Sequence, residues 1–240
     1  MPLVKVTAEL ATDIAITPQG AGTELDGLCY LQMCRHLGSI KKSGKHEVQA
    51  KGDRVRIQGQ IPIPIRQTWV DQDGSRFPVP HCSAAIIEAT PEYKQHYHKS
   101  FPSHHSDKLS ESQRTKFPRG GGVLKSIRLP LRKSQTRRIV WFAELRTKKE
   151  IGRSPMSWLR GILKNVEFLG KKTSQGHGMV SNWTVEATEI EAHWTNGGVL
   201  MRTLPLSVVA ESTKGKRRSF GSVAAPYWQA DFFCNCYVPV

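Results

Sequence analysis

Residues 154–187, SPMSWLRGILKNVEFLGKKTSQGHGMVSNWTVEA, carry the clearest structural signals in this chain of 240 residues. Ser154 can accept a backbone hydrogen bond at the start of a helix, and Pro155 suits the first helical position. The apolar residues that follow form one helical stripe, made of Met156, Leu159, Ile162, Leu163 and Val166. The pattern predicts a helix that begins at Ser154 and ends towards Gly170, followed by a polar loop and a strand over residues 182–187.

Similar patterns predict further elements on both sides of this stretch. Alternating apolar and polar residues indicate a strand over residues 3–16, and apolar residues at helical spacing indicate a helix over residues 25–38. Residues 55–65 also alternate, but two prolines make part of that segment an edge strand. Two more strands are expected later in the chain, over residues 123–131 and 139–145.

The net charge points to a polyanionic partner. The chain has 35 Lys and Arg residues against 20 Asp and Glu residues, which gives +15. Such an excess attracts nucleic acid or anionic membrane. The chain has no stretch of about 18 apolar residues, the length needed to span a bilayer. We therefore expect a nucleic-acid partner and no membrane. Five cysteines without a regular framework are typical of a reducing cytoplasm, where we expect the protein.

The basic residues are concentrated in two segments. Between residues 114 and 138 there is no Asp or Glu, and the nine cations are Arg114, Lys116, Arg119, Lys125, Arg128, Arg132, Lys133, Arg137 and Arg138. A shorter cluster near the C-terminus consists of Lys214, Lys216, Arg217 and Arg218. Both segments are candidates for contact with a nucleic-acid backbone.

The loop after the predicted helix, which we call the glycine loop, is a second candidate site. Its residues are Gly170, Lys171, Lys172, Thr173, Ser174, Gln175, Gly176, His177 and Gly178. Glycines let a backbone approach a ligand closely, and the hydroxyl and amide side chains suit phosphate, sugar or base edges. An ordinary solvated turn is the alternative interpretation. The GxxxxGK[ST] pattern of mononucleotide-binding loops is absent, so nucleotide hydrolysis has no support.

Several motifs together resemble the RAMP superfamily of CRISPR effector proteins, and most closely the Cas-five-type subunit of type IV systems. The motifs are Leu25-Asp26-Gly27-Leu28, the Ser-Pro-x-x-Trp-Leu helix start at 154–159, the glycine loop, Trp-x-Val-Glu at 183–186, Leu204-Pro205, Ala225-Pro-Tyr-Trp228 and the terminal Cys-Asn-Cys. The likeness covers most of the chain, and its most specific part is the glycine loop with its flanking elements.

The resemblance implies an α+β fold with a ferredoxin-like βαββαβ core, here in a single domain over residues 1–240. A second, degenerate module often follows in this superfamily, and a long basic insertion, here at about 81–122, can act as a thumb. The implied function is non-catalytic: the protein holds the repeat-derived 5′ handle of a guide RNA and caps a filament of backbone subunits. Its partners would be the guide RNA, a Cas-seven-like backbone subunit and a large subunit near the handle, with target DNA as a further candidate.

The same resemblance assigns the glycine loop as the RNA-facing loop, whereas the basic residues of the insertion match the family only by location. Aromatic residues among those cations could stack on bases or anchor the insertion to the core; they are Tyr93, Tyr97, Phe101 and Phe117.

Metal-independent RNA cleavage is an alternative function. Some RAMP relatives cut precursor guide RNA with a histidine as general acid or base, and His36, with Tyr30 nearby in sequence, is the candidate here. The other interpretation of His36 is a residue that stabilises a helix C-terminus. We expect no enzymatic activity.

A metal module is a third interpretation. Its candidate ligands are His81-Cys82, His96-x-His98, His104-His105 and Cys234-x-Cys236. Structural zinc sites use compact ligand pairs such as Cys-x-x-Cys, and none of these spacings is diagnostic. The sequence therefore predicts no metal and no other cofactor.

Overall fold

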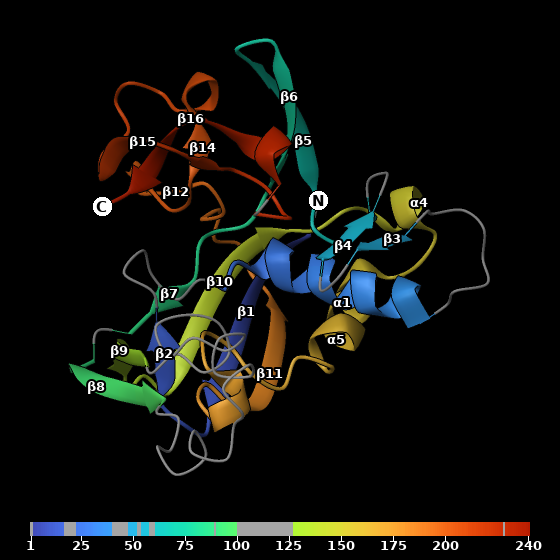
Figure 1. Ribbon diagram of the computed structural model, residues 1–240. Coiled ribbons are helices and arrows are strands. Elements are labelled where there is room, and N and C mark those ends of the chain that lie inside the picture. The colour runs from blue at the N-terminus through green and yellow to red at the C-terminus, as the bar shows by residue number, and fades with distance from the viewer. Residues whose placement is uncertain are drawn as a thin grey trace, which may run out of the picture.

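The computed structural model describes residues 2–16, 23–39, 48–51, 54–57, 61–88, 90–99, 127–227 and 229–240. Over these residues the protein is a mixed α/β structure with many strands and few helices (Figure 1). None of the helices in these ranges is long and apolar enough to cross a membrane.

The largest sheet has four antiparallel strands in the order β11-β1-β10-β7. Their bounds are Val180–Ala187 for β11, Leu3–Leu10 for β1, Arg138–Glu144 for β10 and Ile86–Ile87 for β7. Helix α1 (Leu25–Ser39) follows β1, and helix α5 (Pro155–Leu163) connects β10 to β11. The sheet is therefore built from a strand, a helix, two strands, a second helix and a last strand.

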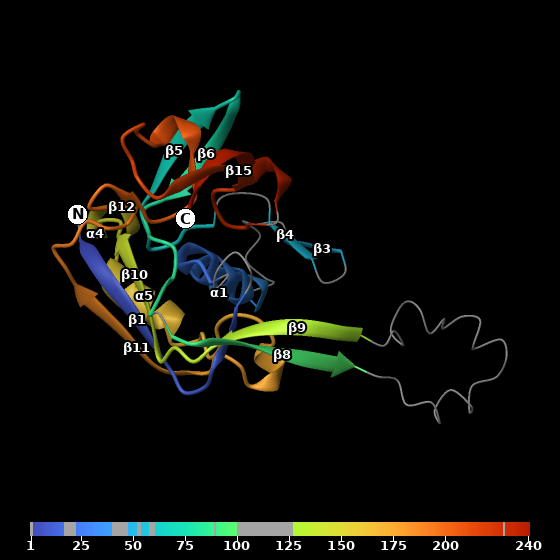
Figure 2. The same cartoon turned by 90° about the vertical axis from the view of Figure 1, so that its left-hand side faces the viewer.

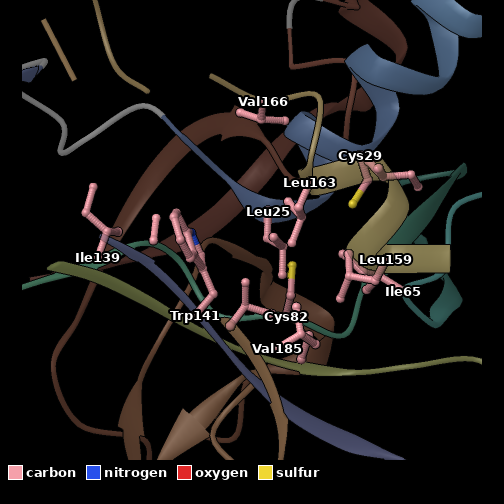
Figure 3. Packing of buried hydrophobic residues seen from close by; sticks show 14 of the residues in the cluster. Leu25, Cys29, Ile65, Cys82, Ile139, Trp141, Leu159, Leu163, Val166 and Val185 are labelled. Atoms are coloured by element: carbon pink, nitrogen blue, oxygen red, sulfur yellow. The ribbon is translucent and has the colours of Figure 1, made fainter. Parts of the chain in front are cut away.

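The main core lies between this sheet and the two helices (Figure 3). Alternate residues of β1 point into it, so that Val4 and Val6 are fully buried, and Trp141 of β10 is also fully buried. Trp141 Nε1 donates to the Thr23 carbonyl at 3.0 Å, which satisfies the one polar atom of this large side chain. Leu159 and Leu163 of α5 complete the core from the helix side.

Helix α5 begins as predicted but ends earlier. The Ser154 side chain accepts from Ser157 N at 3.4 Å, and Pro155 is the first helical residue. The helix ends at Leu163 rather than near Gly170, because Val166 N bonds to the Leu163 carbonyl in a turn and Phe168 then pairs with Met179. Helix α1 confirms the prediction for residues 25–38.

The predicted strand over residues 3–16 is two strands. After β1 the chain turns, and β2 (Ile14–Ile16) joins a second sheet with the order β2-β9-β8. In that sheet β8 is Glu92–Lys99 and β9 is Ile127–Ser134, so the strand expected over 123–131 extends three residues beyond its predicted end. Its first residues, 123–126, fall outside the described ranges.

Two hairpins lie between α1 and β8 in the sequence. Strands β3 (Val48–Lys51) and β4 (Arg54–Ile57) form one, and β5 (Gln67–Gln72) and β6 (Ser75–Pro80) form the other. Of the edge strand expected over 55–65, residues 55–57 belong to β4, and residues 58–60 fall outside the described ranges. Ile61, Ile63 and Ile65 are buried in an irregular segment in which only Ile65 forms a β-bridge.

A second core lies in the C-terminal part of the chain. Its strands are β12 (Thr195–Asn196), β13 (Val199–Leu200), β14 (Leu204–Pro205), β15 (Lys216–Ser222) and β16 (Phe233–Pro239), and the last three pair in the order β14-β16-β15. Phe77 and Val79 of β6 pack with apolar residues of this sheet, which include Leu204 and Cys236. The described residues thus contain two separate clusters of buried apolar side chains.

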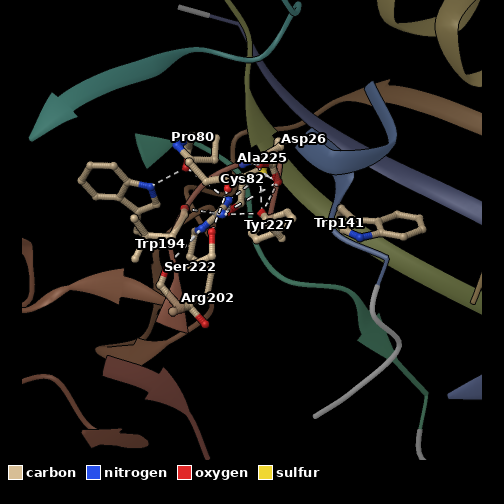
Figure 4. Close-up of polar contacts among 12 residues, drawn as sticks. Asp26, Pro80, Cys82, Trp141, Trp194, Arg202, Ser222, Ala225 and Tyr227 are labelled. Carbon is tan, nitrogen blue, oxygen red and sulfur yellow. Dashed lines mark hydrogen bonds and ion pairs between the residues drawn. The ribbon is translucent and has the colours of Figure 1, made fainter. Parts of the chain in front are cut away.

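A buried polar network joins the two parts (Figure 4). Arg202 is 2% exposed, and its Nη1 donates to the Cys82 carbonyl at 2.8 Å. Its Nη2 lies 3.8 Å from Asp26 Oδ1, in the first turn of α1. Because a buried charge is costly unless it is paired and hydrogen-bonded, Arg202 fixes where the C-terminal part sits against α1.

The segment expected as an insertion at about 81–122 begins within the main fold. His81, Cys82 and Ser83 are buried, and β7 is an edge strand of the main sheet. Further along, β8 and β9 form a hairpin that extends away from the main sheet (Figure 2).

Candidate nucleic-acid interface

The glycine loop folds into a single short turn. A 3-10 helix covers Thr173–Gln175, and it is bracketed by Lys172 and Gly176, both in the left-handed conformation with φ of 58° and 80°. Glycine adopts this conformation without strain, whereas Lys172 does so at a cost. Lys171, Ser174 and Gln175 are exposed, so cationic and neutral donors face solvent from the same turn.

The glycines at the two ends of the loop have a packing role. A Cβ added to Gly170 would lie 2.5 Å from the Ala15 carbonyl oxygen, and one added to Gly178 would lie 2.0 Å from the Leu169 carbonyl oxygen. Of the three glycines in the loop, only Gly176 has open space where a Cβ would be. The outer glycines therefore let the loop pack tightly against the protein itself, and the loop's free surface is in the middle.

Backbone contacts hold the loop against the segment that leads into β2. Lys171 N donates to the Ala15 carbonyl at 2.9 Å, and Gly178 N donates to the Asp13 carbonyl at 2.9 Å. The Thr12 hydroxyl donates to the Gly176 carbonyl at 2.7 Å. These three bonds fix the position of the loop.

The same segment contacts the β8–β9 hairpin on its other side. Ala15 of β2 pairs with Lys133 of β9, and the Tyr93 hydroxyl of β8 donates to Asp13 Oδ2 at 2.6 Å. Lys133 Nζ lies 5.9 Å from the centre of the Tyr93 ring, in a cation–π contact. Asp13 therefore bonds to the glycine loop through its backbone and to the hairpin through its side chain.

His177 of the glycine loop also interacts electrostatically with Lys133 of the hairpin. Burial lowers the pKa of His177, and the positive charge of Lys133 lowers it further. His177 is therefore a neutral ring near pH 7, with donor and acceptor atoms and a face that can stack. The hydrogen bond to Asp13 raises the pKa of Tyr93, which keeps its hydroxyl protonated.

The structure places some of the predicted cations at this junction and pairs others with acidic groups. Lys171 is exposed at the junction, and Lys133 is buried there beside the Tyr93 ring. Arg132 forms an ion pair with Glu92, and Arg138 lies 3.8 Å from Glu88. Arg137 Nη1 donates to the Ala11 carbonyl at 3.1 Å. Predicted residues outside the described ranges are Arg114, Lys116, Arg119 and Lys125, together with the side chain of Arg128.

The C-terminal basic cluster lies elsewhere. Lys216, Arg217 and Arg218 belong to β15, which lies in the part of the molecule opposite the β8–β9 hairpin in both views (Figures 1 and 2). Lys216 Nζ donates to two backbone carbonyls and contacts the Tyr237 ring. The described part of the first basic segment, residues 127–138, and the strand β15 therefore lie in different parts of the molecule.

The alternative catalytic residues lie on α1. His36 is exposed in the last turn of the helix. Burial and the neighbouring Cys34 raise the pKa of Tyr30, which makes Tyr30 a poor proton donor near neutral pH. The catalytic role of His36 stays a prediction.

Sequence reasoning missed Thr12 and Asp13. Both lie in a short turn between two strands that the alternation pattern merged into one, so no spacing singled them out. Tyr93 was recognised only as one of several aromatic residues near cations. The break in alternation at Ala11-Thr12-Asp13 is the signal that could have revealed the turn.

The comparison with protein families bears on the C-terminal half. Residues 135–239, from just before β10 to the end of β16, match the family described as CRISPR type IV associated protein Csf3. No curated protein matches the chain. The matched segment contains the glycine loop, α5 and the C-terminal strands of the second core, and the match supports an association of the chain with type IV CRISPR systems.

Proposed function

We propose that this protein is a non-catalytic RNA-binding subunit of a type IV CRISPR ribonucleoprotein. In this proposal it holds the repeat-derived 5′ handle of the guide RNA and caps the filament of backbone subunits. The family match supports the CRISPR assignment. The observation that carries the RNA assignment is Asp13, which bonds to both the glycine loop and the β8–β9 hairpin.

The chemistry of this junction suits single-stranded RNA. Lys171 is exposed and would contact a phosphate, whereas Lys133 is only 5% exposed and would add positive charge from beneath the surface. The exposed Ser174 and Gln175 would donate to sugar or base atoms. Tyr93 is 37% exposed, so part of its ring is free for stacking. A flexible strand gripped by phosphate contacts and one or two stacked bases is the usual pattern of such sites.

The topology supports a ferredoxin-like core as the scaffold of this site. The sheet order β11-β1-β10-β7 places the first and third strands of a βαββαβ unit at the centre, and both helices contribute to one core. We include the RAMP assignment in the proposal, with residues 1–240 acting as one functional domain. The second core then corresponds to the smaller module that the resemblance implies.

The proposed partners follow from the same assignment. They are the guide RNA, a Cas-seven-like backbone subunit and a large subunit near the handle, with target DNA as a further candidate, all in the cytoplasm. The remote basic strand β15 is available for a second nucleic-acid or protein contact, because Arg217 and Arg218 are exposed on it.

Co-purification tests this function. The protein is recovered with its complex from cells that express a type IV repeat array, and the bound RNA is sequenced. RNAs that share one repeat-derived 5′ end support the proposal, and a lane of random cellular RNA contradicts it. Ultraviolet crosslinking then maps the contact, which we expect at Tyr93 and the glycine loop.

A further inference from the structure

Three buried side chains from distant parts of the sequence converge outside the nucleic-acid interface. They are His81, directly after β6, Glu144, the last residue of β10, and His193, between β11 and β12. Each is 7% exposed, and one ligand atom of each lies within 4.8 Å of the other two. We propose that these three side chains bind a Zn²⁺ ion.

Two nitrogen atoms at this site have no hydrogen-bond partner. They are Nδ1 of His81 and Nδ1 of His193, and both are buried. His81 Nδ1 lies 2.7 Å from Glu144 Oε2, so this nitrogen and the carboxylate already face each other. Because a buried polar atom without a partner is destabilising, two imidazole nitrogens and a carboxylate oxygen left together favour a cation between them.

The other polar atoms of two ligands are held by outer partners. His81 Nε2 is hydrogen-bonded to the Thr68 hydroxyl at 2.7 Å, and Glu144 Oε1 accepts from Arg66 Nη1 at 2.7 Å. The backbone is fixed as well, since Glu144 N donates to the His81 carbonyl at 2.8 Å. Outer contacts of this kind orient metal-binding side chains, and they leave the inner atoms for the ion.

The donor set fits zinc. Two imidazole nitrogens and one carboxylate oxygen are ligands that Zn²⁺ accepts at about 2.0–2.2 Å, with a fourth position left for water or another ligand. The Trp194 ring packs 4.4 Å from the His81 ring and shields the site on one side. Arg66 is a nearby cation, but its charge is paired with Glu144.

An ion at this place would join the two parts of the fold. Glu144 belongs to the main sheet, whereas His193 leads into the C-terminal strands and His81 follows the β5–β6 hairpin, which packs on the second core. The proposed role is therefore structural. The proposed zinc site departs from the expectation, based on the sequence, that the protein binds no metal. The proposal does not depend on RNA binding.

The test starts with the full-length chain. After chelator treatment and dialysis, Zn²⁺ binding is titrated against a chromophoric competitor, and the metal content of untreated protein is measured by mass spectrometry. We expect about one Zn²⁺ per chain and a melting temperature that rises when Zn²⁺ is added. A wild-type protein that binds no Zn²⁺ at micromolar concentration overturns the proposal.

Variants then locate the ion. Glu144→Gln and His193→Gln should abolish stoichiometric binding, and Thr68→Val, which removes only an outer contact, should weaken it about 10–100-fold. His96→Gln, on an exposed histidine of β8, and the double variant Cys234→Ala with Cys236→Ala should bind like wild type. Unchanged binding in Thr68→Val and in every ligand variant that folds contradicts this site. Loss of binding in a cysteine variant whose circular dichroism spectrum shows that it folds assigns the ion to the thiols instead.

Discussion

The Tyr227 hydroxyl donates a hydrogen bond to the carboxylate of Asp26, a residue 201 positions earlier in the sequence. The hydroxyl oxygen lies 2.8 Å from Oδ1 and 2.9 Å from Oδ2. Asp26 belongs to the Leu25-Asp26-Gly27-Leu28 motif, and Tyr227 belongs to Ala225-Pro-Tyr-Trp228. The neighbouring Gly27 leaves room for the Tyr227 ring, since a Cβ there would lie 3.2 Å from it. Two motifs that are far apart in the sequence thus form one contact between α1 and the C-terminal part.

Replacing Asp26 should destabilise the protein strongly. Asp26→Ala leaves Arg202 buried without its carboxylate partner, and breaking a buried pair costs about 3–5 kcal/mol of unfolding free energy. Urea denaturation of both proteins measures the loss. Asp231→Ala, at an exposed position, is the control and should change stability by less than about 0.5 kcal/mol. Equal stability of the two variants would show that the network is dispensable.

The glycines of the loop should differ in their sensitivity to substitution. Gly176→Ala should cost about 1–2 kcal/mol, because the left-handed backbone is strained but a methyl group has space. Gly178→Ala adds a clash with the Leu169 carbonyl and should cost about 1–3 kcal/mol more. Thermal unfolding compares them, and similar losses in both variants would contradict the packing role of Gly178.

Much of the fold was accessible from the sequence because the signals were local. The Ser154-Pro155 start of α5, the apolar faces of α1 and β1 and the strand that contains Trp141 follow from periodicity and capping. The end of α5 at Leu163 was missed because Val166 continues the apolar stripe although the backbone has already left the helix.

Only part of the candidate nucleic-acid interface could be predicted from the sequence, because its residues come together through long-range contacts. Composition identified the glycine loop and the cations of β9, but not that Asp13 brings them together. The pairing of Arg132 with Glu92 and of Arg138 with Glu88 also depends on strand register, which the sequence does not specify. The same holds for His81, Glu144 and His193, which are separated by at least 49 residues in sequence and meet only in the folded chain.

The ring of Tyr93 should contribute more to RNA binding than its hydroxyl. Tyr93→Ala should weaken binding of handle RNA by about 1–3 kcal/mol, the contribution of one stacked base. Tyr93→Phe keeps the ring and loses only the bond to Asp13, so it should retain most of the affinity. Fluorescence anisotropy with labelled RNA measures both. If Tyr93→Ala binds like wild type, no base stacks on this ring.

We expect no cleavage of precursor guide RNA by the purified protein. Labelled precursor incubated with and without divalent metal should stay intact, and His36→Ala should bind RNA like wild type. Metal-independent cutting that His36→Ala abolishes would instead establish the endoribonuclease alternative.

The salt dependence of handle binding tests the RNA interface most directly. The variant combines Lys171→Ala with Lys172→Asn, because asparagine tolerates the left-handed backbone at position 172. Its control is Lys148→Ala with Lys149→Ala, which removes two adjacent exposed lysines from helix α4 (Lys148–Ile151).

Each lost phosphate contact should make the negative slope of log K against log salt shallower by about 0.7. We predict a slope whose magnitude is smaller by about 0.7–1.4 in the loop variant, and an unchanged slope in the control. Identical slopes for wild type, loop variant and control would contradict the assignment of the glycine loop as an RNA-binding site.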